Sequence, residues 1–80
     1  MTQAAGQTRT FSVHTRQTGR QHSRVLTEAS FEAAAVAYVE DFHPPVGGDN
    51  EVSLIVRDVG TGHEQCFRID LDSGEAAPCD

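Results

Sequence analysis

Apolar and polar residues alternate in three segments of the chain, and alternation is the period of a β-strand. The segments are residues 10–15 (TFSVHT), 51–57 (EVSLIVR) and 65–71 (QCFRIDL). Residues 23–27 (SRVLT) are a further strand candidate. Which side chains of this strand face the core is left undecided, because neighbouring Val25 and Leu26 cannot both point into one core. The pattern therefore predicts four strands.

A helical period replaces the alternation in residues 31–41. Apolar side chains there form one stripe with helical spacing, made of Phe31, Ala34, Ala35, Tyr38 and Phe42. Ser30 is a good N-cap for this helix, and the prolines at residues 44 and 45 end it.

The last two predicted strands form a hairpin if Thr61 and Gly62 are its two-residue loop. Three apolar pairs then meet across the strands: Val56 with Phe67, Leu54 with Ile69, and Val52 with Leu71. A slip of one residue would destroy all three pairs. The predicted order is β-β-α-β-β, an α+β fold of two layers with a four-stranded, mainly antiparallel sheet and one helix packed on one face. Residues 1–8 read as a flexible arm, 9–75 as one domain, and 76–80 as a flexible tail.

The distribution of charge is more informative than the net value of −6. Four arginines and no acidic residue lie in residues 1–27, whereas all twelve acidic residues lie in 28–80 with two arginines. The arginine-rich segment should therefore be attracted to the acidic remainder, within one chain or between chains.

No segment reaches the ~20 apolar residues that span a bilayer, and the first residues lack the hydrophobic stretch of a secretory signal. We therefore expect a cytoplasmic protein without a membrane partner, whose cysteines stay reduced. A disulfide between Cys66 and Cys79 is sterically conceivable but is disfavoured in that compartment.

His63 and Cys66 raise the alternative of a metal or thiol site, because imidazole and thiolate suit zinc. A structural zinc usually takes four ligands in paired spacing, and the chain contains no CxxC motif. No third group is seen that would orient His63 as a base for a nucleophilic cysteine. We therefore expect no metal, no cofactor and no enzymatic activity.

The sheet face away from the helix is the predicted interaction face. Its residues are Ser53, Ile55, Arg57, Cys66, Arg68 and Asp70. In the predicted register, Glu51 also lies on this face, opposite Asp72. Because an edge strand readily recruits another chain, the sequence favours a protein-binding or adaptor module that uses this face or an edge. Its partner is a different protein or a second copy.

A basic hairpin is the other alternative, since Arg16, Arg20 and Arg24 fall close together and β-ribbons can enter a nucleic-acid groove. The acidic remainder of the chain would repel phosphate, so we do not expect nucleic acid as the partner.

Two runs carry a resemblance, SFEAAAVAYVEDFHPP and EVSLIVRDVGTGHEQCFRIDLDSGEAAPC. They are similar to those of short bacterial proteins of unknown function. The likeness covers most of residues 10–79 and includes no catalytic motif, so it implies neither an activity nor any site residue.

Overall fold

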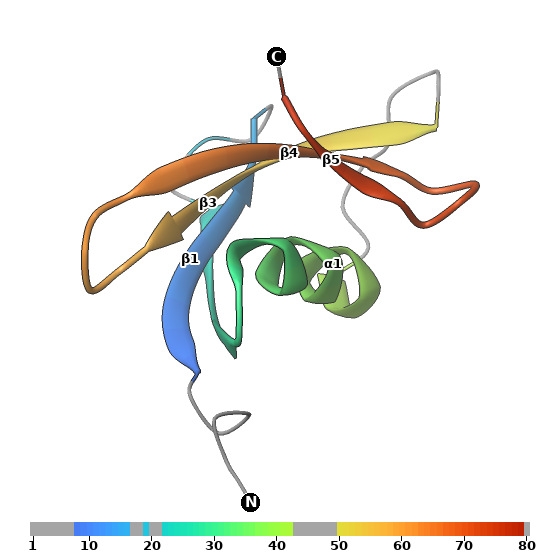
Figure 1. Ribbon diagram of the computed structural model, residues 1–80. Helices are drawn as coiled ribbons and strands as arrows, with labels where there is room; N and C mark the ends of the chain where they lie inside the picture. The colour runs from blue at the N-terminus through green and yellow to red at the C-terminus, as the bar shows by residue number, and fades with distance from the viewer. Residues whose placement is uncertain (1–7, 17–18, 20–21, 43–49, 80) are drawn as a thin grey trace, which may run out of the picture.

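The computed structural model describes residues 8–16, 19, 22–42 and 50–79, which form one sheet and one helix (Figure 1). The elements are β1 (Arg9–Thr15), β2 (Arg24–Glu28), α1 (Phe31–Phe42), β3 (Glu51–Asp58), β4 (Glu64–Asp70) and β5 (Ala76–Pro78). The strands lie in the order β2-β1-β3-β4-β5, and every neighbouring pair is antiparallel. The predicted α+β class is confirmed.

The prediction of four strands is wrong, because residues 76–78 form a fifth strand along β4. These residues belonged to the expected flexible tail. A run of three residues that includes a proline is too short to show alternation, so its pairing with β4 was not visible in the pattern. Of the expected flexible arm, residues 1–7 lie outside the described residues.

Helix α1 begins where the sequence predicted. The Ser30 hydroxyl accepts a hydrogen bond from the Ala33 amide at 3.0 Å, which is the contact of an N-cap. Ala34, Ala35 and Tyr38 are buried, and small side chains at the contact let the helix approach the sheet closely. The helix ends at Phe42, one residue later than predicted.

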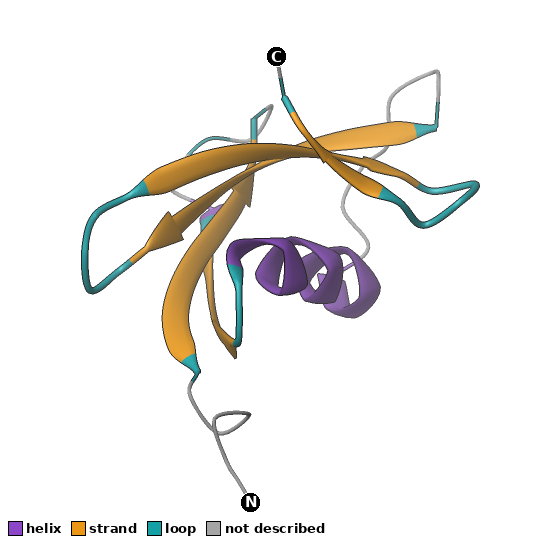
Figure 2. Ribbon diagram, viewed as in Figure 1, coloured by secondary structure: helices purple, strands orange, loops and turns teal. Residues whose placement is uncertain are grey.

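The core lies between α1 and one face of the sheet. Its largest fully buried side chains are Phe11, Leu54, Val13 and Val56, contributed by β1 and β3. Figure 2 shows the helix against one side of a sheet that curves around it, and among the described residues no helix lies on the other side. The uncovered side is called the open face below.

The predicted pairing of β3 with β4 is wrong by two residues. Leu54 lies opposite Phe67 and Val52 opposite Ile69, whereas Val56 lies opposite Gln65. A shift of two residues leaves every side chain on its predicted face, because the strand period is two. Val52, Leu54, Val56, Phe67 and Ile69 are all buried.

The turn between β3 and β4 explains the shift. A two-residue type I′ loop needs a positive φ at both central residues, but only Gly62 has one, with φ of 80°. The chain instead closes with a hydrogen bond from the Asp58 amide to the His63 carbonyl, so four residues lie in the loop. Asp58 holds this longer loop by accepting hydrogen bonds from the Gly60 and Thr61 amides.

Candidate binding site on the open sheet face

The six residues of the predicted interaction face share the open face, as the strand register requires. Ser53 lies opposite Arg68, and Ile55 lies opposite Cys66. Arg57 and Asp70 follow in the same alternation, and Arg57 lies opposite Glu64. The pair of like charges at the sheet end is Glu51 with Asp70, rather than Glu51 with Asp72 as the predicted register placed it.

A pocket of about 400 Å³ lies on the open face. Its lining comes from β1, β2, β3, β4 and the residues that join them: Ser12, His14, Ser23, Val25, Arg57, Val59 and Glu64. Ser12 is central, because it lies opposite Val25 on one side and Arg57 on the other. Only Arg57 was among the residues predicted from sequence for this face.

Two of the missed lining residues, Val59 and Glu64, lie just outside the predicted strands 51–57 and 65–71, and the others belong to β1, β2 and the connection between them. In the structure Phe11 and Val13 of β1 are buried in the core, so Ser12 and His14 lie on the open face. The sequence did not decide which side chains of β2 face the core, because Val25 and Leu26 are neighbours and only one of them can do so. The structure turns Leu26 toward the core and leaves Val25 67% exposed on the open face. With that choice made, β1 and β2 complete the pocket.

His14 is buried, at 8% exposure, although it lies on the open face. It sits opposite Ile55 of β3 and lines the pocket from β1. His14, Ser23 and Glu64 each make a further interaction within the protein. Val25 and Val59, 67% and 53% exposed, contribute the accessible apolar surface. The pocket thus combines two exposed valines with hydroxyls and both signs of charge.

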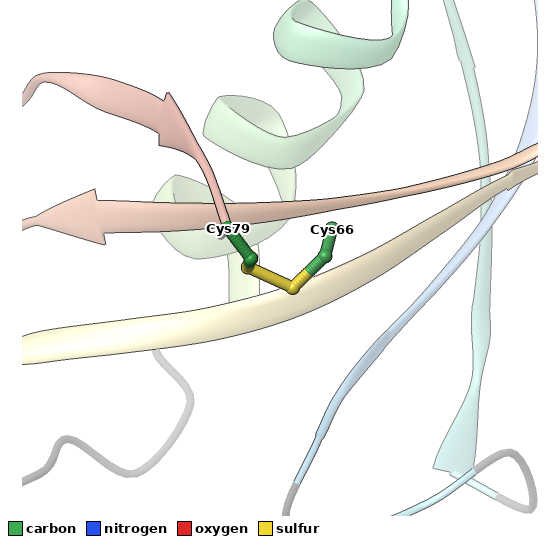
Figure 3. Close-up of a disulfide and its surroundings, with 2 residues drawn as sticks. All are labelled: Cys66 and Cys79. Atoms are coloured by element: carbon green, nitrogen blue, oxygen red, sulfur yellow. A yellow bond between two sulfur atoms is a disulfide. The ribbon is translucent and has the colours of Figure 1, made fainter.

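Cys66 and Cys79 form a disulfide on the same face (Figure 3). Figure 3 shows the bridge running from β4 to the chain just beyond β5. The two Cα atoms are 5.2 Å apart, and the Cys79 amide donates a hydrogen bond to the Cys66 carbonyl at 2.9 Å. The expectation of reduced cysteines is therefore wrong for this structure. Backbone pairing of β5 with β4 brings the two residues directly opposite each other, within the usual Cα separation for a disulfide.

The structure does not bring His63 and Cys66 together as a metal or thiol site. The His63 ring packs edge-on against Phe31 of the helix, with centroids 5.5 Å apart, whereas Cys66 lies on the open face and is bonded to Cys79. Within residues 8–16, 19, 22–42 and 50–79, no group of three or more histidine, cysteine or carboxylate side chains is arranged to hold a metal ion.

Of the three arginines of the predicted basic hairpin, Arg16 and Arg24 lie in the part of the chain that is described. Arg24 lies opposite Val13, which places it on the helix side of the sheet, and its guanidinium is 5.3 Å from the Phe42 ring centre. Arg16 is exposed just after β1, and Arg20 lies outside the described residues.

Comparison with known proteins gives one result. Residues 9–80 match the family model described as a family of unknown function, DUF5961. No curated protein matches, and no solved structure matches. In the described residues, α1 falls short of the length and apolar character of a membrane-crossing helix.

Proposed function

This chain belongs to that family of unknown function, and we propose that it is a non-enzymatic protein-binding module that holds an extended segment of a partner protein on its open sheet face. The observation that carries the proposal is the pocket of about 400 Å³ with two exposed valines on the open face. Single exposed apolar residues are ordinary on protein surfaces, but two that line one concave site are a feature of binding sites.

The lining favours a peptide segment over an ion or a flat aromatic ligand. Val25 and Val59 offer contact for an apolar side chain, while Ser12 adds a hydroxyl that can bond to a backbone amide or carbonyl. Arg57 and Glu64, with opposite charges, lie opposite each other on β3 and β4. A segment with an apolar residue flanked by polar ones matches this mixture, and charge complementarity at the rim would fix its direction.

Site-specific crosslinking tests the proposal. A photoreactive amino acid at Val59 should capture one defined partner in cell extract, whereas the same group at the exposed turn residue Ser73 should not. The purified partner should then bind the unmodified protein directly. Val25→Asp or Val59→Asp should weaken that binding at least tenfold, because each places a charge against an apolar contact (about 1.4 kcal/mol or more).

Ser73→Asp is the matched control, since it adds the same charge at an exposed position away from the pocket. Equal capture from positions 59 and 73, or unchanged affinity in both valine variants, would contradict binding at this face.

A further inference from the structure

The two edges of the sheet are built differently. At one edge, β5 carries Pro78, which lies between the inward-bonding neighbours Ala77 and Cys79 and has no amide hydrogen to offer outward. At the other edge, β2 has no proline, and no described strand pairs with its outer side. Proline on an edge strand blocks pairing with another chain. The edge at β2 lacks that protection.

The backbone groups that β2 offers to the outside follow from the hydrogen bonds of β1. The Thr10 carbonyl accepts a hydrogen bond from the Val59 amide, and the Arg16 amide donates one to the Ser53 carbonyl. The even-numbered residues of β1 therefore form their backbone hydrogen bonds with β3. Its odd-numbered residues therefore bond toward β2, and their partners there are Arg24, Leu26 and Glu28. The amides and carbonyls of Val25 and Thr27 consequently point away from the sheet.

The sequence of β2, RVLTE, is complementary to itself in charge. If β2 pairs antiparallel with β2 of a second copy about a twofold axis at Leu26, Val25 lies opposite Thr27 of that copy and both bond outward. Arg24 then lies opposite Glu28 of the second copy, twice by symmetry, and the two Leu26 side chains meet on the helix side. A shift of two residues is the smallest that keeps Val25 and Thr27 at the hydrogen-bonded positions, and it would place Leu26 opposite Arg24 or Glu28 of the second copy instead.

A groove beside this edge fits the same arrangement. It has a volume of about 600 Å³ and runs from Glu28 at the end of β2 along α1, over Ala33, Val36 and Ala37, with Glu32 and Glu40 among its lining. Twofold pairing extends the sheet and sets the two α1 helices on the same side of it. Arg24 of the second copy then arrives at the acidic end of the groove, beside Glu28.

We propose that the chain forms a twofold symmetric homodimer through the outer edge of β2, with Arg24 of each copy paired to Glu28 of the other. Charged residues on a short edge strand usually keep other chains away. Here the spacing makes the charges attract under self-pairing, since opposite charges directly across antiparallel strands are favourable and like charges are not. The inference is independent of what binds the open face.

Charge reversal gives a test that distinguishes this pairing from any other dimer. Arg24→Glu and Glu28→Arg each place like charges opposite each other at two positions, so each variant alone should dimerise roughly 30-fold more weakly than the wild type. Mixing the two variants restores both opposite-charge pairs, so the mixture should form a heterodimer. The double variant R24E/E28R should again form a homodimer. Sedimentation velocity over a concentration series measures all four samples.

Thr27→Pro tests the backbone part of the interface. It removes an outward amide hydrogen without removing a bond to β1, so the variant should fold, as circular dichroism would show, and stay monomeric. Arg68→Glu is the matched control, because it reverses an exposed arginine on the open face of β4 and should dimerise like the wild type. A wild type that stays monomeric up to millimolar concentration would overturn the proposal. So would a dimer that survives both Arg24→Glu and Thr27→Pro, or a mixture of the charge variants that fails to associate.

Discussion

Asp58 is a buried carboxylate that connects the first residue of β1 to the turn after β3. It is 2% exposed. One of its oxygens accepts hydrogen bonds from the Gly60 and Thr61 amides, and the other pairs with Nη1 of Arg9 at 3.1 Å. The Arg9 guanidinium also lies within 5.6 Å of the Phe11 and Phe31 ring centres. The attraction that the charge distribution predicts, between an arginine-rich segment and acidic residues farther along, takes this form in the described residues.

Removing the two partners should reveal their coupling. Arg9→Gln should lower the free energy of unfolding by about 1 kcal/mol, because half of the Arg9 side chain is exposed and water screens the pair. Asp58→Ala should cost about 2 kcal/mol, since it also removes the acceptor for two turn amides. A double-mutant cycle measured by urea unfolding should give a coupling energy near 1 kcal/mol. Strict additivity of the two losses would show that the ion pair contributes nothing.

The hairpin connections repeat one local pattern. Residues 15–19 (TRQTG), 58–62 (DVGTG) and 70–74 (DLDSG) each begin with threonine or aspartate and end with serine or threonine before a glycine. In each, the glycine amide donates to the carbonyl of the first residue, at 3.2, 2.7 and 2.7 Å. The glycine φ values are 81°, 80° and 78°. In the β3–β4 and β4–β5 connections the first residue also bonds to the residue directly after the glycine, so a shared four-residue loop sets the register of these two strand pairs.

This pattern shows how far sequence reasoning reaches at the level of elements. Alternation assigned the side chains of β1, β3 and β4 to the correct faces, because burial acts on every second residue. It did not assign the pairs across β3 and β4, because registers that differ by two bury the same set. The loop decides between them, and the repeated final glycine was the available signal. Comparing DVGTG with DLDSG would have favoured the four-residue loop over Thr61-Gly62 alone.

Gly62 should be far less tolerant of a side chain than Gly60, although both lie in one loop. Gly62 has a φ of 80°, so Gly62→Ala should destabilise the protein by about 1 kcal/mol. Gly60 does not have a positive φ, and an added Cβ would lie 3.4 Å from an Asp58 oxygen, close to ordinary contact. Gly60→Ala should therefore change stability by less than about 0.5 kcal/mol. Thermal unfolding of both variants makes the comparison, and equal losses would contradict the assigned role of Gly62.

At the scale of the whole molecule, the sequence allowed the two layers to be predicted but not the far end of the sheet or the full pocket. The fold class followed from three alternating segments, one further strand candidate and one helical stripe. The pocket depends on whether Val25 or Leu26 points into the core, and this is determined by packing against the whole core and not by the local sequence. The chain just beyond strand β5 is joined to β4 by the disulfide between Cys66 and Cys79, in addition to the backbone pairing of β5 with β4. The cysteine spacing permitted that bond, but the assumed compartment disfavoured it. The strand itself was missed because three residues that include a proline are too short to show alternation.

The disulfide should make a measurable contribution to the stability of so small a domain. It closes a loop between residues 13 apart in sequence, and loop-closure entropy for such a length corresponds to about 3 kcal/mol. The double variant Cys66→Ser/Cys79→Ser should therefore unfold roughly 10 °C or more below the wild type. Hydrogen exchange should show lost protection at the Cys79 amide and along β5, which is held to β4 by only three paired positions.

The hairpin of β1 and β2 supplies the internal control, because it is separated from β5 by β3 and β4 and should keep its protection below the unfolding temperature. Wild-type protein treated with a dithiol reductant should match the serine variant, and the variant itself should not respond to the reductant. If the reduced wild type instead keeps both its melting temperature and the protection of β5, the backbone ladder and the contacts of β5 with α1 are sufficient to hold that strand. In that case β5 pairs with β4 without the disulfide, and the disulfide forms because that pairing brings the two cysteines together.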